Sequence, residues 1–182
     1  MCGRAHLSTD FSEIKLVFNL PPDQPVPNFA PTYNLAPTDP IPVIRRDPET
    51  RARRLDVIRW GLIPYFWHKT LKELKFTTIN AKAEGIETAS FYRLPFRQRR
   101  CLIPLDGFYE WKKLGPDDKQ PYSVGLKGGG LMAVAGLWDR WQRSSEMVHS
   151  ATIITCPPNS LCAELHDRMP VILPLEAWSV WL

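Results

Sequence analysis

The chain has 182 residues, of which 44% are hydrophobic and 23% are charged, an ordinary globular composition that predicts one domain over residues 1–182. No stretch approaches the roughly 18 consecutive apolar residues of a membrane-spanning helix, and no apolar run follows a basic start, which excludes a helical membrane protein. The net charge of +4 permits a nucleic-acid partner without requiring one, although arginines cluster within residues 45–46, 51–54 and 97–100.

The first part of the chain predicts one helix and then a long loop. Asp10 can cap a helix, Glu13 stands three residues later, and four apolar side chains fall on one helical face: Phe11, Ile14, Val17 and Phe18. Residues 21–40 contain closely spaced prolines, each of which restricts its own backbone and that of the preceding residue. We expect this segment to form an ordered loop that is extended and rich in turns.

The rest of the chain predicts short strands separated by turns. Residues 41–46 and 53–62 form a hairpin around DPET, and residues 75–81 form a strand that leads into a helix. Further strands are expected at 101–105, 107–113, 121–126, 131–141, 149–156 and 169–173, with helices at 159–166 and 174–182. These elements predict an α+β fold whose mainly antiparallel sheet curls toward a barrel with flanking helices. Because the chain ends soon after its closing apolar segment begins, we also expect a natural C-terminal tail to be missing.

The cysteines bear on location and on metal binding. The four cysteines have no paired short spacing, which favours a reducing, intracellular location, and for a bacterial protein the cytoplasm or nucleoid. Cys156, Cys162 and His166 are spaced C-x5-C-x3-H, which fits no common zinc pattern, so we expect no metal or other cofactor and two small buried cysteines. The glycines at 128–130 are a hairpin-turn signal, not a phosphate-binding loop.

The opening segment Met-Cys-Gly-Arg contains the first candidate reactive residue, Cys2. A small residue at position 2 permits removal of Met1, which would leave an α-amine and a thiol together on Cys2. The amine could add to an aldehyde to form a Schiff base, and the thiol could then close onto the same carbon to form a thiazolidine ring. The alternative is that Cys2 is only the second residue of a frayed terminus.

Three other residues could supply acid–base or orienting groups. Glu110 stands in the aromatic segment GFYEW, where partial desolvation would suit it to exchange protons with a sugar hydroxyl, or where it forms a buried ion pair with an arginine. The imidazole of His166 could protonate or deprotonate the attacking and leaving groups at the sugar, or it could have a structural role. Asn80, at the predicted junction of strand and helix, could orient the terminal amine or cap the helix.

Seven segments occur in the order found in one known family: MCGR, PTYNLAPT, RWGLIP, TINAKAE, RRCLIPLDGFYEW, AGLWDRW and LHDRMPVIL. The chain thereby resembles the SOS-response-associated peptidase (SRAP) family along essentially its whole length. The resemblance implies a compact, mainly β fold and a covalent thiazolidine crosslink to abasic sites in single-stranded DNA, which shields the lesion. It also implies that Cys2 is the nucleophile, Asn80 positions it, Glu110 is its acid–base partner, and His166 assists Schiff-base formation and reversal.

The same resemblance implies contacts with DNA. Arg4, Lys82 and Arg168 would bind phosphates near the lesion, a task that suits a guanidinium fork. Many family members have arginine where this chain has Lys82. A guanidinium can donate two hydrogen bonds to one phosphate, whereas the Lys82 ammonium would contact it as a point charge. The family often has tyrosine where this chain has Ala5, which removes one aromatic contact.

Three aromatic residues could stack on bases or separate the strands of a duplex junction, namely Phe66, Trp67 and Trp111. Their alternative role is core packing.

Two other functions compete with lesion capture, which would be a crosslinking and lyase-like activity. The first is a thiol autoprotease or peptidase that cleaves after Met1 and uses Cys2, His166 and Glu110 as nucleophile, base and orienting group. The second is a non-covalent sensor of DNA structure that acts through the arginine clusters. In each case we expect a monomer with no membrane partner.

Overall fold

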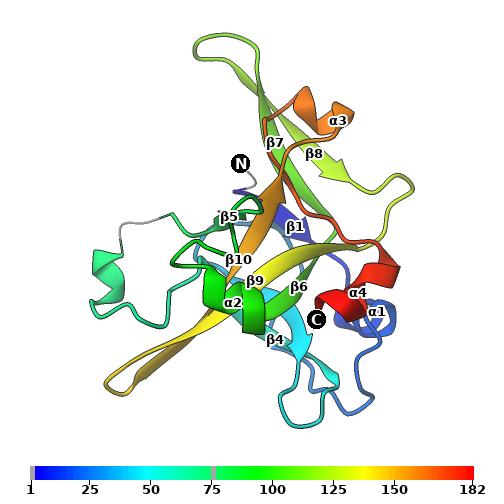
Figure 1. The fold of residues 1–182 in the computed structure, drawn as a ribbon. Coiled ribbons are helices and arrows are strands. Elements are labelled where there is room, and N and C mark those ends of the chain that lie inside the picture. The colour runs from blue at the N-terminus through cyan, green and yellow to red at the C-terminus, as the bar shows by residue number, and fades with distance from the viewer. Residues whose placement is uncertain (1–2, 75–76) are drawn as a thin grey trace.

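The centre of the molecule is a barrel closed by five strands, seen in a computed structural model that describes residues 3–74 and 77–182 (Figure 1). Its strands follow the order β10-β4-β3-β6-β9, and β9 pairs with β10 to close the ring. All neighbours are antiparallel except β4 and β10, which are parallel. The strands are β3 (Pro40–Arg46), β4 (Arg53–Trp60), β6 (Arg100–Leu105), β9 (Met132–Arg143) and β10 (Glu146–Cys156). The predicted α+β class with a curled antiparallel sheet is confirmed.

The barrel interior is filled by apolar side chains at close quarters. Ile103 of β6 is fully buried, and Trp60 buries its ring while its indole N–H donates to the carbonyl of Ile79 at 3.0 Å. Gly136 of β9 faces Ile103 so closely that an added Cβ would lie 2.7 Å from its Cδ1 atom. Burial of such side chains is the main stabilising contribution to the fold.

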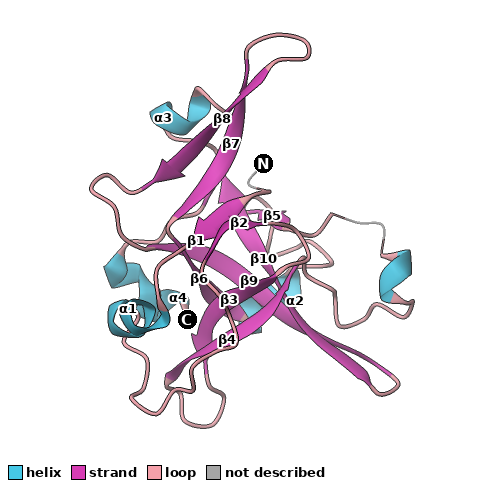
Figure 2. Cartoon of the chain, turned by 180° about the vertical axis from the view of Figure 1, so that it is seen from behind, coloured by secondary structure: helices cyan, strands magenta, loops and turns pink. Residues whose placement is uncertain are grey.

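A second sheet of four antiparallel strands lies against one end of the barrel, in the order β2-β1-β7-β8. Its strands are β1 (Ala5–Leu7), β2 (Thr32–Leu35), β7 (Gly107–Lys113) and β8 (Lys119–Gly125). Asp106, between β6 and β7, accepts hydrogen bonds from the backbone N–H groups of Ser8 at 2.6 Å and Thr9 at 2.9 Å. The β7–β8 hairpin extends away from the barrel with α3 (Ser160–Ala163) beside it (Figure 2).

The predicted first helix is confirmed as α1 (Phe11–Val17). The Asp10 carboxylate accepts from the backbone N–H of Glu13 at 3.0 Å, which satisfies one of the unpaired donors of the first turn. Phe18 is buried and stacks on Trp178 of the closing helix α4 (Trp178–Trp181), with ring centroids 4.6 Å apart. The helices α1 and α4 therefore pack together against the barrel.

Several local predictions differ from the structure. The proline-rich segment contains a short strand, β2, because residues 32–35 pair with the edge of β1. The strand predicted at 75–81 is observed as β5 (Asn80–Lys82), with residues 75–76 outside the described part, and turns follow it where a helix was expected. The next helix, α2, begins only at Arg93 and ends at Gln98. The predicted last strand is shorter, as β11 (Met169–Pro170).

The glycines at 128–130 do not form a hairpin turn, since β8 and β9 belong to different sheets and this segment connects the two. All three glycines have positive φ angles, so the connection uses backbone conformations that other residues rarely adopt. Two 3₁₀ turns, η1 (Leu71–Glu73) and η2 (Leu175–Ala177), complete the described elements. No helix in the described ranges is long and apolar enough to cross a membrane.

Candidate active site

The described chain begins alongside β7, next to a buried carboxylate. The backbone N–H of Tyr109 donates to the carbonyl of Arg4 at 2.9 Å, so the residues leading into β1 run beside the strand that carries Glu110. In Figure 1 this start of β1 lies where β7, β5 and the end of β10 meet. Cys2 lies outside the described residues, and its role as nucleophile stays a prediction.

Glu110 is buried, with 4% of its surface exposed, and faces α3. Burial and then the Glu110 carboxylate raise the pKa of the Cys162 thiol in α3, which indicates that the two side chains are neighbours. An ion pair of 3.6 Å between Lys112 Nζ and Glu164 Oε2 also joins β7 to the end of this helix.

His166 follows α3 directly and is held by its neighbours in the chain. Its backbone N–H donates to the carbonyl of Cys162 at 2.9 Å, and its ring is 30% exposed. The Nδ1 atom lies 3.0 Å from the backbone nitrogen of Arg168 and 2.7 Å from Oδ1 of Asp167. Nδ1 accepts from the first partner only when it carries no proton, and pairs with the carboxylate when it carries one. Both contacts come from the two residues that directly follow His166 in the chain.

Asn80 and Lys82 approach the same region from β5. This strand runs parallel to β10, with Asn80 opposite Ile153 and Lys82 opposite Thr155. The hydroxyl of Tyr92 donates to the carbonyl of Asn80 at 3.3 Å, and no helix follows for the Asn80 side chain to cap. Its alternative role as a helix cap is therefore wrong.

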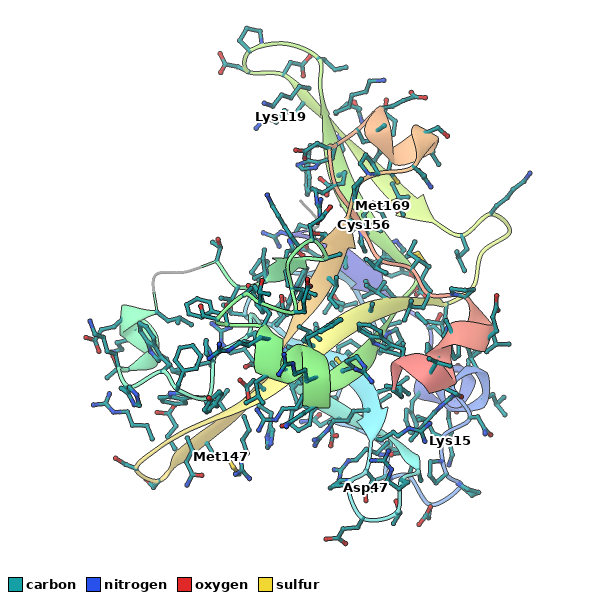
Figure 3. The ribbon with its side chains drawn as sticks, viewed as in Figure 1. Lys15, Asp47, Lys119, Met147, Cys156 and Met169 are labelled. Carbon is teal, nitrogen blue, oxygen red and sulfur yellow. The ribbon has the colours of Figure 1, made fainter. Side chains whose placement is uncertain are left out.

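Arg168 is oriented by Glu84, which lies four residues after Asn80. Its two Nη atoms each lie 2.8 Å from an oxygen of Glu84, and Nη2 also donates to the carbonyl of Thr155 at 2.5 Å. The hydrogen bond from Arg168 lowers the pKa of the Glu84 carboxyl to about 2. Arg168 and Lys82 therefore sit together at the end of β10, close to the pairing of Cys156 with Met169 (Figure 3).

Trp111 lies on the other side of β7 from Glu110, because side chains alternate along a strand. It is 39% exposed and lines a pocket of about 390 Å³ with Arg4, Tyr33, Asn34 and Tyr109. A guanidinium N–H of Arg4 donates to Oδ1 of Asn34 at 3.1 Å. Tyr33 and Asn34 were not among the predicted site residues, although they belong to the segment PTYNLAPT. Their pairing with β1 is what brings them there.

Phe66 and Trp67 lie in a different loop, between β4 and η1. Phe66 packs against Phe91 with ring centroids 5.8 Å apart, and the Trp67 indole N–H donates to the carbonyl of Thr70 at 3.1 Å. The buried Trp141 holds the loop through a 2.6 Å bond to the carbonyl of Trp67. Phe66 and Trp67 are both partly exposed, but neither lines the pocket that Trp111 lines.

The cysteines expected to be small and buried differ from one another. Cys162 is buried, as predicted, whereas Cys156 is only partly buried because it is the last residue of β10. Within residues 3–74 and 77–182, no group of three or more histidine, cysteine or acidic residues could hold a metal ion.

The candidate site residues come from four separated parts of the chain. Arg4 directly precedes β1, Glu110 lies on β7, Asn80 lies on β5, and His166 and Arg168 lie between α3 and β11. The site thus combines a buried carboxylate, an imidazole, an amide and cationic groups, and it lies near the start of the chain. Such a set can bind an anionic sugar-phosphate and move protons at a reacting carbon.

Comparisons with known proteins identify relatives of this chain. The abasic site processing protein YoqW of Bacillus subtilis is 42% identical over 183 residues, which span all 100% of this chain and 80% of that protein. The abasic site processing protein HMCES of Xenopus tropicalis is 30% identical and spans 85% of this chain and 54% of that protein. A crystal structure from Bacteroides thetaiotaomicron superimposes with a TM-score of 0.87 at 25% identity, covering 100% of this chain and 81% of the other.

The sequence profile of the family described as SOS response associated peptidase matches residues 1–182, the whole chain. With the shared fold and these relatives, the match confirms the resemblance that the seven ordered segments indicated. The chain belongs to the SOS response associated peptidase (SRAP) family.

Proposed function

We propose that this protein recognises abasic sites in single-stranded DNA and captures them as a thiazolidine through Cys2 after Met1 is removed. Relatives that are 30% and 42% identical are named abasic site processing proteins, which supports an abasic site as the substrate. The observation that carries the chemistry is the buried Glu110 on the strand along which the start of the chain runs. The protein would act as a single-domain monomer.

The proposed reaction joins the amine and thiol of Cys2 to the aldehyde of the ring-opened sugar. The amine adds to the aldehyde carbon to give a carbinolamine, and Glu110 in its acid form protonates the departing hydroxyl, so that water leaves and an iminium remains. The thiol sulfur then bonds to the same carbon, the C=N electron pair returns to nitrogen, and the thiol proton passes to Glu110. One water is released in total.

The other site residues would orient these groups. The amide of Asn80 would position the terminal amine, and His166 would exchange protons with the sugar during formation and reversal of the Schiff base. Arg4, Lys82 and Arg168 would bind the phosphates on either side of the lesion, because charge-assisted bonds to phosphate are the strong ones.

One assay tests the proposal. The protein is incubated with a single-stranded oligonucleotide that carries one abasic site and is analysed on a denaturing gel, beside Cys2→Ala, Cys2→Ser and a form that retains Met1. Only the processed protein with Cys2 should give a stable shifted band. A stable band of equal intensity with Cys2→Ala would overturn the proposal.

Reversal gives a separate test of Glu110. The purified crosslink is mixed with an excess of a competing abasic oligonucleotide, and transfer to the competitor is followed with time. Because reversal needs the same proton transfers in the opposite order, Glu110→Gln should release the first oligonucleotide about 100-fold more slowly. Equal release rates for the two proteins would remove Glu110 from this step.

Autoproteolytic removal of Met1 is a second candidate function, favoured by the family's description as a peptidase. The same residues would serve it, with Cys2 as nucleophile and His166 and Glu110 moving protons. Mass spectrometry of protein made without a methionine aminopeptidase decides the matter, since self-cleavage predicts that Glu110→Gln retains Met1 and the wild type does not.

A further inference from the structure

A pocket lined by arginines lies on the barrel outside the candidate site. It has a volume of about 420 Å³, and Arg45, Arg46, Arg51, Arg97 and Arg100 surround it together with Trp138. No acidic side chain is among the described residues that line it. The arginines come from β3, the β3–β4 turn, α2 and β6, so the tertiary structure gathers residues of all three sequence clusters in one place.

Most of this charge has no carboxylate partner. Arg45 is the exception, with its Nε atom 2.6 Å from Oδ2 of Asp56. Arg46 donates to the backbone carbonyls of Arg51 at 3.0 Å and Ser179 at 3.3 Å.

Arg100 likewise donates to carbonyls, those of Trp181 at 2.5 Å and Phe96 at 3.0 Å. In the described part of the chain, no ion pair involves Arg46, Arg51, Arg97 or Arg100. Carbonyl groups hold such side chains in place but do not neutralise them, so the pocket attracts anions.

Trp138 indicates which part of a ligand the pocket would bind. The guanidinium of Arg45 lies 4.1 Å from the centroid of the Trp138 ring, and that of Arg99 lies 5.8 Å away. With these cations against it, the ring is not an open platform for a base. The pocket therefore favours a phosphate backbone and is indifferent to base sequence.

We propose that this pocket is a second, non-covalent binding site for the phosphodiester backbone of the same single-stranded DNA that carries the lesion. Trp138 pairs with Ala151, five residues before Cys156 on β10, which places the pocket roughly 17 Å along the strand from the candidate site. The inference rests on the proposed function, because that site sets where the strand is held. A strand longer than the lesion segment can then be held at two places.

The test measures binding of abasic-free single strands of increasing length by fluorescence anisotropy. The variant is Arg51→Ala/Arg97→Ala, because both side chains are exposed and neither makes a side-chain hydrogen bond or ion pair within the described residues. The matched control is Lys127→Ala/Arg143→Ala, which removes two exposed charges outside the pocket.

The pocket variant should bind the shortest strands like the wild type and the long strands about tenfold more weakly. On long strands, the plot of log K against log salt should be less steep than that of the wild type by about 1.4, which is about 0.7 for each lost phosphate contact. The control should match the wild type at every length. Equal weakening by both double variants, or weakening that does not depend on strand length, would overturn the second site.

A crosslinking assay keeps this result separate from the proposed function. A short abasic oligonucleotide should crosslink equally well to the wild type and to Arg51→Ala/Arg97→Ala. Normal crosslinking without any length-dependent loss of affinity contradicts only the arginine pocket, whereas absence of crosslinking in the wild type contradicts the proposed chemistry.

Discussion

Arg168 donates from both of its Nη atoms to the two carboxylate oxygens of Glu84, at 2.8 Å each. The arginine that the family resemblance assigns to phosphate binding is therefore already oriented and partly neutralised by an acid four residues after Asn80. A phosphate that binds Arg168 must share it with Glu84 or replace the carboxylate.

Glu84→Gln should tighten the binding of single-stranded DNA about threefold at low salt, because it removes a negative charge from the phosphate site. Fluorescence anisotropy with an abasic-free oligonucleotide measures the change. Glu87→Gln is the control, since Glu87 is an exposed acid in the same segment and makes no ion pair among the described residues. Weaker binding by Glu84→Gln would mean that orientation of Arg168 outweighs its neutralisation.

The same ion pair predicts a pH dependence of stability. The pKa of Glu84 falls from the reference value of 4.5 to about 2 in the folded protein, chiefly through its hydrogen bond with Arg168. A lowered folded pKa stabilises the protein fully above 4.5, and this contribution is lost as pH falls toward about 2. The difference in unfolding free energy between wild type and Glu84→Gln, measured with urea, should shrink across that interval. A constant difference would contradict the pairing.

The cysteines within the fold should react slowly with alkylating reagents. Burial raises the pKa of the Cys101 thiol far above its usual range and also raises the pKa of Cys156 and Cys162. The thiolate is the nucleophile, so iodoacetamide should modify Cys101 and Cys162 at least about tenfold more slowly in native than in denatured protein. Peptide mapping by mass spectrometry gives the rates. Rapid native labelling of Cys162 would show that it is not buried beside Glu110.

Gly136 should be intolerant of even a methyl group. An added Cβ would lie 2.7 Å from Ile103 Cδ1 and 3.0 Å from Cys101 Sγ inside the barrel. Gly136→Ala should therefore lower the free energy of unfolding by about 1–3 kcal/mol, as overpacking does in other cores. Chemical denaturation measures this against Gly115→Ala, whose Cβ would meet only Asp118 at 3.8 Å. Equal stability of the two variants would be inconsistent with the close approach of β6 and β9.

Trp111 should contribute to DNA affinity but not to the chemical step. It lies on the side of β7 opposite the buried Glu110, and stacking on a base contributes roughly 1–3 kcal/mol. Trp111→Ala should weaken binding of single strands about tenfold while the crosslinking rate at saturating DNA stays within about twofold of the wild type. Met147→Ala, an exposed residue at the far hairpin of β9 and β10 (Figure 3), provides the control. Unchanged affinity in Trp111→Ala would remove its stacking role.

Elements with strong local signals were predictable from the sequence. The Asp10 cap and the apolar spacing that follows it specify α1, and the run GFYEWKK coincides with β7. Local patterns failed where pairing with a distant segment decides the structure. Thr32–Leu35 becomes a strand only because the edge of β1 is available to it, and the glycines at 128–130 connect two sheets that no local signal distinguishes.

By itself, the sequence determined the family, the class of fold and the identity of the chemical groups, since motif order and residue type are local properties. The tertiary structure alone decided which groups meet. Three contacts join residues that are far apart in the chain. Glu110 lies beside α3, Glu84 binds Arg168, and five arginines surround one pocket. Their proximity follows from the pairing of distant strands, such as β5 and β11 with β10 and β3 with β6, and that pairing depends on packing of the whole core at once.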